Sequence, residues 1–297
     1  MAVSLLFLWP GQTPAKPSCA IRVASFNIHY IVPSDEDEDW GKRKQAVTSV
    51  LKDIDADIIA FQEMETFEGG HYSYRNLQLD WINATTTDYK DAAVGDPKIF
   101  PSTQPILYKP SKFTVVDQGF FFFSDTPDKI YSRQWDGRYP YFCSWARFHG
   151  RYIGKDFYLF NVHNDYKSRS NRLKTSALIA DRINKMVPEN VPVMVLGDFN
   201  ASKRSEEIQL LKAIGLSVVK PGGGTFRLWG IQLPMAIDHV LVSKEFEPLS
   251  KINVWQDRYD GVYPSDHDPI SVKLELKDDG TGASYCSMNS GDASLSN

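Results

Sequence analysis

Six clusters of acidic, amide and imidazole side chains lie at the ends of apolar runs along this chain. Five follow such a run and the sixth precedes the last run; in order they are Ser25-Phe26-Asn27, Phe61-Gln62-Glu63, Asn161-Val162-His163-Asn164-Asp165, Gly197-Asp198-Phe199-Asn200, Ile237-Asp238-His239 and Ser265-Asp266-His267-Asp268-Pro269. Loops at strand ends are where rigid scaffolds present catalytic groups. The clusters therefore predict one catalytic site assembled from several strands.

Three of these residues offer oxygen atoms that suit a hard divalent cation. Asn27, Glu63 and Asp266 carry amide and carboxylate oxygens, which suit Mg²⁺, Mn²⁺ or Ca²⁺ far better than zinc or copper. The sequence has no Cys-x-x-Cys pair and no cysteine–histidine cluster that would indicate a zinc site. The residue types predict a site for one of these three hard cations.

The remaining candidates suit acid–base work on a phosphate. Asp238 and His267 can form a carboxylate–imidazole pair, in which the acid fixes the tautomer and supports the charged ring. Asp198 and Asn200 are two residues apart in a strand-end turn, so both can hold one attacking water. His163 can stabilise negative charge that develops on a phosphoryl oxygen.

Each cluster taken alone also has a purely structural interpretation. A single Asn or Asp at a strand end is commonly a turn former or a cap, and Glu63 has the acidic neighbours Glu65 and Glu68 of a solvated loop. Four histidines are interpreted as surface or core residues and left outside the predicted site: His29, His71, His149 and His239. Turn formation does not explain six such clusters in succession.

The elements between the clusters alternate between strands and helices. Apolar runs predict strands at 21–27, 56–61, 105–108, 113–116, 119–123, 142–149, 156–162, 192–196, 237–243 and 270–276. Apolar residues at helical spacing predict helices at 41–54, 72–82, 170–186 and 204–214. No linker interrupts residues 20–277, so we expect one layered α/β domain rather than the two that the length of 297 residues suggests.

Composition excludes several classes of protein. With 42% hydrophobic and 24% charged residues, the chain is neither disordered nor collagen-like nor wholly embedded in a membrane. A net charge of −4 argues against coating of a polyanion with positive charge. It does not exclude a phosphate-handling enzyme, because bound cations supply positive charge locally. No obligate protein partner is evident.

The two ends differ from the middle. Residues 1–19 form an N-terminal extension with a short apolar run, interpreted either as a signal-peptide remnant, with a secreted or periplasmic protein, or as a disordered extension of a cytoplasmic one. Residues 278–297 are rich in Gly, Ser and Asn and are predicted to be disordered. Of three cysteines, Cys143 is expected to be buried, while Cys19 and Cys286 are either a disulfide or free thiols.

Taken together, the motifs resemble the endonuclease/exonuclease/phosphatase superfamily, with its deoxyribonuclease-like fold. The matching segments occur in the order of that family and span roughly residues 20–276; besides the clusters above they include Pro105-Ile106-Leu107-Tyr108 and Ile237-Asp238-His239-Val240. Gly197-Asp198-Phe199-Asn200 together with Ser265-Asp266-His267 is the most specific part.

The resemblance implies a four-layered α/β sandwich: two mixed, mainly antiparallel β-sheets face to face, with helices outside. It also implies hydrolysis of a phosphate ester that depends on Mg²⁺ or Mn²⁺. Glu63 is then the principal metal ligand, with Asn27 and Asp266 completing the metal shell. Asp198 and Asn200 orient the water, the Asp238–His267 pair performs acid–base work, and His163 holds a phosphate oxygen.

Two details place the chain within the superfamily. Gln62-Glu63 is followed by Met64-Glu65 rather than the Thr-Lys of abasic-site endonucleases, so we disfavour that branch. Related nucleases carry a carboxylate before the Pro105 strand as the partner of the motif histidine, where this chain has Ser102-Thr103-Gln104. Asp165 is one substitute partner, or it only shapes its loop.

Substrate choice depends on the variable loops. Arginines with interleaved aromatics, among them Arg133 and Arg172, together with Asp165, are the candidates for substrate contacts, although the aromatics equally suit the edges of the sandwich. The first hypothesis is a phosphodiesterase or nuclease that cleaves DNA or RNA. The alternative is a phosphatase or phosphodiesterase of a sugar, inositol, nucleotide or sphingomyelin type of substrate. A remote alternative is an inactive binding module on the same fold.

Overall fold

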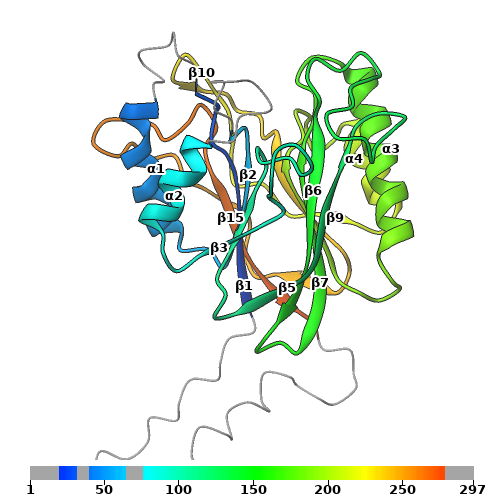
Figure 1. Cartoon of the computed structure of the whole chain (residues 1–297). Coiled ribbons are helices and arrows are strands. Elements are labelled where there is room, and N and C mark those ends of the chain that lie inside the picture. Colours follow the sequence, from blue (N-terminus) through cyan, green and yellow to red (C-terminus); the bar gives the residue numbers. More distant parts are fainter. Residues whose placement is uncertain (1–19, 32–39, 65–75, 278–297) are drawn as a thin grey trace, which may run out of the picture.

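Two β-sheets pack face to face at the centre of the protein, and a pair of helices covers the outer face of each (Figure 1). The computed structural model describes residues 20–31, 40–64 and 76–277. The predicted N-terminal extension, the predicted tail, Cys19 and Cys286 lie outside these residues. The four layers confirm the sandwich predicted from the sequence.

The first sheet has the strand order β13-β15-β1-β2-β4-β3, with β14 also paired to β15. Its strands are β1 Ala20–Asn27, β2 Ile58–Gln62, β3 Lys90–Ala92, β4 Ile106–Tyr108, β13 Phe246–Pro248, β14 Asn253–Val254 and β15 Ile270–Leu276.

The second sheet has the order β5-β6-β7-β8-β12-β9, and a separate hairpin pairs β10 with β11. These strands are β5 Phe113–Phe122, β6 Phe142–Gly150, β7 Lys155–His163, β8 Val193–Asp198, β9 Ser217–Val218, β10 Arg227–Leu228, β11 Ile231–Gln232 and β12 Asp238–Val242. Within the described strands, β1–β2 and β7–β8 pair in parallel and all other pairs are antiparallel. Both sheets are therefore mixed and mainly antiparallel.

Strand alternation divides the apolar residues between an inner and two outer cores. In β1, Val23 faces the core between the sheets, whereas its neighbours Ala24 and Phe26 pack toward the helices. Phe157 and Leu159 of β7 likewise face the core between the sheets, while Phe160 packs toward the helices that cover the second sheet. The helices are α1 Trp40–Ile54 and α2 Leu77–Thr85 on the first sheet, and α3 Arg169–Met186 and α4 Glu206–Ala213 on the second.

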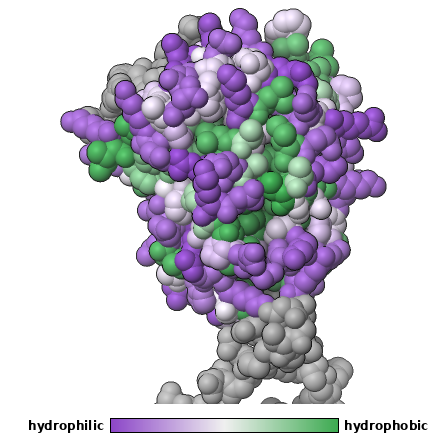
Figure 2. Space-filling model, turned by 90° about the vertical axis from the view of Figure 1, so that its right-hand side faces the viewer, coloured by the Kyte–Doolittle hydropathy of each residue, from purple (hydrophilic) through white to green (hydrophobic). Residues whose placement is uncertain are grey.

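The face on the side of α3 and α4 is mostly hydrophilic, with hydrophobic residues showing in a broken band along its middle (Figure 2). This distribution is typical of amphipathic helices that bury one side against a sheet. Ile179 and Ile183 supply the buried side of α3. No helix in the described part of the chain is long and apolar enough to cross a bilayer.

Several boundaries differ from the sequence predictions. The two strands expected at 113–116 and 119–123 are one strand, β5, with an irregularity in register between Val115 and Asp117. A bulge interrupts the alternation without ending the strand, which explains the error. Helix α2 begins at Leu77 rather than 72, because the side chain of Asn76 caps it by accepting a hydrogen bond from Leu79 N. The strands of two or three residues, such as β3 and β9, are too short to show the alternation of apolar and polar residues by which a strand is predicted.

A row of buried polar side chains joins the two sheets. Gln62 of β2 donates from Nε2 to Oδ1 of Asn161 in β7, at 2.7 Å. Asn161 returns a hydrogen bond from Nδ2 to the carbonyl of Phe61, at 2.8 Å. Gln62 and Asn161 are both 0% exposed. This inter-sheet connection lies one residue from Glu63 and two from His163, so it fixes the separation of the strand ends.

Candidate active site

The topology brings all six polar clusters to one edge of the sandwich, opposite the edge where the described chain begins and ends (Figure 1). The parallel strands β1 and β2 end together, with Asn27 paired to Gln62, and β7 and β8 end together, with His163 paired to Asp198. Strand β12 runs antiparallel to β8 and begins at this same edge, where Asp238 pairs with Asp198. The two parallel pairs therefore juxtapose motifs that are far apart in sequence.

Three non-glycine residues of the site itself have left-handed backbone conformations. They are His29, Glu63 and Asn200, with φ angles of 59°, 57° and 47°. Such conformations are uncommon for residues with a Cβ and concentrate at functional sites. At Gly197 the φ angle is 142°, and a Cβ there would lie 1.9 Å from the carbonyl oxygen of Val162. Only glycine fits this position, next to Asp198.

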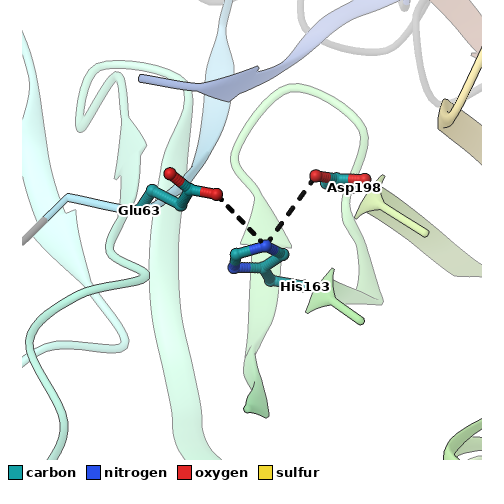
Figure 3. A group of neighbouring side chains, drawn as sticks. All are labelled: Glu63, His163 and Asp198. Carbon is teal, nitrogen blue, oxygen red and sulfur yellow. Dashed lines mark ion pairs between the residues drawn. The ribbon is translucent and has the colours of Figure 1, made fainter. Parts of the chain in front are cut away.

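Glu63, His163 and Asp198 form the centre of the site (Figure 3). His163 Nε2 lies 3.4 Å from Glu63 Oε1 and 3.8 Å from Asp198 Oδ2. The ring of His163 meets that of Tyr141 edge-on, with 4.8 Å between centroids. Burial lowers the pKa of His163 to about 3. The imidazole is therefore neutral at physiological pH and donates one N–H.

Asn27 connects the two carboxylates of this centre. Its Nδ2 donates to Glu63 Oε1 at 3.0 Å and to Asp198 Oδ2 at 3.1 Å, while its Oδ1 accepts from the backbone N–H of His29. Asn27 is 1% exposed. In this arrangement both ends of the amide are engaged within the protein, and Asn27 holds the carboxylates in place.

Asp198 is positioned from both sides. The backbone N–H of Asn200 donates to its Oδ1 at 2.8 Å, and Nδ2 of Asn200 lies 3.3 Å from its Oδ2. Burial is the largest effect on this carboxyl and raises its pKa to about 7. A carboxylate with a pKa near the working pH is well suited to accept a proton from water.

His267 and Asp238 form the predicted carboxylate–imidazole pair. Nδ1 of His267 lies 3.0 Å from Asp238 Oδ2, and Nε2 lies 3.7 Å from Asp198 Oδ2. Although burial disfavours the charged ring, the surrounding carboxylates, Asp238 first among them, raise the pKa of His267 well above its usual value. His267 is therefore an imidazolium at neutral pH.

Asp266 is held by the turn that precedes β15. Ser265 Oγ donates to the carbonyl of Asn27 at 2.8 Å and lies 3.2 Å from Asp266 Oδ1, while His267 N donates to Ser265 Oγ. Hydrogen bonds and nearby imidazoles outweigh burial and lower the pKa of Asp266 to about 2. This segment therefore forms a turn and also places Asp266 in the site.

His29 lies in the site, although the sequence analysis left it out. Its Nδ1 is 3.3 Å from Asp266 Oδ1 and 3.8 Å from Glu63 Oε2. The sequence feature that could have identified His29 is its position two residues after Asn27, at the end of a strand. The other two described histidines set aside lie elsewhere: His149 pairs with Asp156, and the fully buried His239 contacts the carbonyl of Ala201 through Nε2.

The three candidates for substrate contacts have other partners. Asp165 accepts hydrogen bonds from the backbone N–H groups of Lys167, Ser168 and Arg138, so its carboxylate shapes the loop after β7. Arg172 contacts Glu207 at 3.3 Å and the carbonyl of Asp165 at 2.9 Å. Arg133 is exposed, and its Nη1 donates to the carbonyl of Arg138. None of the three lines the cavity above the site.

That cavity has a volume of about 520 Å³. Its floor consists of site residues: His29, Glu63, His163, Asp198, Asn200, Asp266 and His267. Its walls are largely aromatic and apolar: Tyr30, Tyr131, Tyr139, Pro140, Tyr141, Phe142, Tyr166, Phe226, Leu233, Met235 and Ile237, with Thr103 and Gln104. Among the described lining residues there is no lysine and no arginine.

The donor set fits a divalent cation. Glu63, His163 and Asp198 each offer a ligand atom, and these atoms lie within 4.8 Å of one another. Burial and, after it, the charge of Asp266 raise the pKa of Glu63, so the charged form of this carboxyl is disfavoured in the protein alone. A bound cation favours the charged form.

Comparison with known proteins bears on the family and the fold. Residues 24–267 match the family model described as the Endonuclease/Exonuclease/phosphatase family. The structure is similar to a mannosyl-6-phosphatase from Bacteroides thetaiotaomicron, with 26% identity and a TM-score of 0.74 over 86% of this chain and 100% of that one. It is equally similar to a functionally unknown conserved protein from Enterococcus faecalis, with 25% identity, a TM-score of 0.74 and the same coverage.

More distant structures share the fold. TDP2 of D. rerio, complexed with a single-strand DNA product, has 15% identity and a TM-score of 0.66 over 87% of this chain and 100% of that one. At this identity the similarity shows the fold alone. No curated protein matches the chain in sequence.

Proposed function

The chain belongs to the endonuclease/exonuclease/phosphatase family of phosphoester hydrolases, and from this premise we propose that it is a divalent-metal-dependent hydrolase of small organic phosphates, with a phosphorylated sugar as the best-supported class. The lining of the cavity carries this proposal. Hydrolysis of DNA or RNA, the first hypothesis from the sequence, is the competing candidate.

The cavity suits an organic group attached to a phosphate. Its volume of about 520 Å³ falls within the range of about 300–1,000 Å³ found for small-molecule sites. Tyr30, Tyr139 and Tyr166 line the cavity together with the catalytic residues. Nucleic-acid sites instead place Lys and Arg along the phosphate backbone. The described lining has no such side chain, which favours a substrate with a single phosphate group.

The relative with the most informative description supports the same class. The Bacteroides thetaiotaomicron protein at 26% identity is described as a mannosyl-6-phosphatase, and the alignment covers all of it. A hexose phosphate joins a compact hydroxylated ring, which stacks on aromatic side chains, to one terminal phosphate. An aromatic wall above a catalytic floor is the arrangement that such a molecule requires.

The residues of the floor divide the reaction between them. Asp198, held by Asn27 and Asn200, orients the attacking water and accepts its proton. The imidazolium of His267, supported by Asp238, stabilises the charge that develops on the phosphoryl oxygens, and neutral His163 donates its N–H to another of them. A cation held by Glu63 and Asp266 would supply Lewis-acid stabilisation of the phosphoryl group.

A parallel substrate panel tests the proposal. Purified protein with Mn²⁺ or Mg²⁺, and with EDTA as the control, is assayed for phosphate release from hexose phosphates and nucleotides and for nicking of plasmid DNA. We expect EDTA-sensitive phosphate release from a hexose phosphate. DNA cleavage that weakens steeply with salt, without phosphate release from the small esters, would support the nuclease hypothesis instead.

A pair of tyrosine variants links the result to the cavity. Tyr139→Ala removes a ring from the wall, whereas Tyr152→Ala removes a half-exposed ring outside the cavity lining. We expect Tyr139→Ala to raise the KM for the sugar phosphate while Tyr152→Ala leaves it unchanged. Equal effects of the two variants would contradict the assignment of the wall to substrate binding.

A further inference from the structure

The hairpin of β10 and β11 has one polar face and one apolar face. Arg227 is paired with Gln232, and Leu228 is paired with Ile231. Because successive side chains of a strand point to opposite faces, the two polar residues share one face and the two apolar residues the other. Arg227 Nε donates to Asp268 Oδ1 at 2.7 Å and Gln232 Nε2 to Asp268 Oδ2 at 2.9 Å. The polar face is thereby anchored, while Leu228 and Ile231 are 43% and 68% exposed.

The apolar face continues the wall of the cavity. The backbone N–H of Leu233 donates to the carbonyl of Phe226 at 2.9 Å, which extends the pairing of the hairpin toward the catalytic residues. By the same alternation, Phe226 and Leu233 lie on the face of Leu228 and Ile231. Phe226 and Leu233 both line the cavity, and the ring of Phe226 lies 5.0 Å from that of His267 between centroids. One apolar surface therefore leads outward from His267.

The tip of the hairpin is a tryptophan at a position where turns favour other residues. Trp229 and Gly230 form the two-residue turn, with φ angles of 51° and 75°. Two left-handed residues in such a turn are typically Asn-Gly or Asp-Gly, because bulky residues seldom adopt this conformation. Trp229 is nevertheless 90% exposed, so burial of its ring does not offset the conformational cost. An uncommon conformation that packing does not explain is typical of binding positions.

We propose that this hairpin binds an apolar group attached to the phosphorylated sugar, namely an alkyl or aryl aglycone. The inference rests on the proposed function and adds the chemical class of the substrate beyond its sugar ring. The binding surface, here called the apolar strip, consists of Phe226, Leu228, Trp229, Ile231 and Leu233. It carries no charged group and no hydroxyl, so it suits a hydrocarbon better than a second phosphate.

The position of the apolar strip decides which molecule it binds. Its inner end packs against His267, so a group that covers the strip leads into the cavity above the catalytic floor. In Figure 1 the hairpin, labelled at β10, projects from the edge of the sandwich that carries the site. At about 3.3 Å per residue, the distance from Phe226 to Trp229 is about 10 Å, the length of an extended octyl chain.

A second protein fits the strip less well. A stable protein–protein interface takes about 20–30 residues on each side, whereas the strip belongs to a single hairpin whose strands have two residues each. Continuity with the cavity is also unnecessary for a protein partner. The aglycone of the substrate explains both the small size of the strip and its direction.

A series of glycosides tests the proposal. The 6-phosphates of methyl, butyl and octyl glucoside are assayed for phosphate release with Mn²⁺, and kcat/KM is compared along the series. We expect kcat/KM to rise by about 10-fold or more from the methyl to the octyl compound, because each added methylene buries apolar surface. The ratio of the two values is the readout, since a general loss of activity cancels in it.

Trp229→Asn removes the ring and supplies a residue that this turn favours, so the variant should melt at the wild-type temperature or above. We expect the octyl-to-methyl ratio to fall by about 5-fold or more in Trp229→Asn. Tyr152→Ala is the matched control, because it removes a half-exposed ring that does not line the cavity, and it should keep the wild-type ratio.

Three results would overturn the proposal. They are an octyl-to-methyl ratio near one in the wild type, a wild-type ratio in Trp229→Asn, and a higher kcat/KM for a 6-phosphorylated disaccharide than for the octyl compound. Binding to phosphatidylcholine vesicles that Trp229→Asn abolishes, without any effect of chain length, would also overturn it in favour of a membrane contact. Failure of the proposed function has a different signature: calorimetry would show tighter binding of the octyl compound, with no phosphate released from any glycoside.

Discussion

The side chain of Gln62 donates a 2.7 Å hydrogen bond to Oδ1 of Asn161, and this bond joins the two sheets directly beneath the active site. Gln62 precedes Glu63, and Asn161 lies two residues before His163. Because both side chains are fully buried, the bond forms in a low-dielectric environment, where an unpaired polar group is costly. The distance between Glu63 and His163 therefore depends on a pair that contacts no substrate.

Gln62→Met should lower both the free energy of unfolding and kcat, and the two effects can be measured separately. It preserves the length of the side chain but leaves Asn161 Oδ1 without this donor, which should lower the free energy of unfolding by about 1–3 kcal/mol. We expect kcat to fall more than KM changes, since the catalytic residues shift while the cavity wall remains. Urea unfolding and steady-state kinetics measure both, with Gln209→Met on the exposed side of α4 as the control. A wild-type kcat would show that the connection does not position the site.

Arg43 should be the helix residue on which the site most depends. Buried in α1 with 2% exposure, it donates to the carbonyls of Ile28, His29 and Pro264, and so holds the loops that carry His29 and Asp266. Arg43→Met removes this donor from all three carbonyls, at about 1–3 kcal/mol for each one that is left without a partner.

The expected result for Arg43→Met is a lower melting temperature and weaker Mn²⁺ binding in the same variant. Lys52→Met on the exposed side of α1 is the control for loss of positive charge. Unchanged metal affinity in a folded Arg43→Met protein would argue against this role.

His267 should set the high-pH limit of activity. The charge of Asp238 helps to raise the pKa of His267 well above 6.5, so the imidazolium persists at neutral pH and is lost as the pH rises through this raised pKa. Asp238→Asn removes that charge, and the alkaline limb of the kcat profile should move to lower pH. His267→Ala should reduce kcat about 10²- to 10³-fold. An alkaline limb that stays in place in Asp238→Asn would contradict the pairing.

The contribution of Asp198 to the stability of the metal-free protein should fall as pH rises toward neutrality, whereas the contribution of His163, whose pKa burial lowers from 6.5 to about 3, rises over the window between these two values. Asp198 titrates at about 7 when folded, against a usual value of 3.8, so the folded protein retains a proton that the unfolded chain has lost between these values. The stabilisation is present below the lower pKa and is lost as pH rises through the upper one. Burial and Asp266 raise the pKa of Glu63 in the same direction.

Added Mn²⁺ should reverse this loss, because deprotonated carboxylates bind the ion. The increase in melting temperature caused by Mn²⁺ is expected to be larger at about pH 7.5 than at about pH 5.5. The His149→Gln protein, whose altered ion pair with Asp156 lies outside the site, controls for binding of Mn²⁺ to surface carboxylates. An equal shift at both pH values would contradict the raised pKa values.

The sequence was sufficient to predict the four layers of the sandwich and the grouping of the motif residues at one edge. Strand periods and polar strand ends predicted the sandwich, because residues such as Asn27 and His163 follow long buried runs. The sequence analysis left out His29 because its place in the site depends on a left-handed backbone and on hydrogen bonds from Arg43 and Gln78, which are distant in sequence. Arg172 was a candidate for substrate contact because of its basic and aromatic neighbours in sequence. Its ion pair with Glu207 depends on tertiary structure, so the sequence could not show it.

The central claim is that the Glu63 floor hydrolyses a phosphate ester with a bound cation, and Glu63→Gln tests it most directly. The measurement is the rate of phosphate release from the best hexose phosphate against Mn²⁺ concentration, for wild type and variant. We predict activity that EDTA abolishes and excess Mn²⁺ restores, and a loss of about 10²-fold or more in a folded Glu63→Gln protein. A Glu63→Gln protein with the wild-type rate, or wild-type hydrolysis in EDTA, would contradict the account.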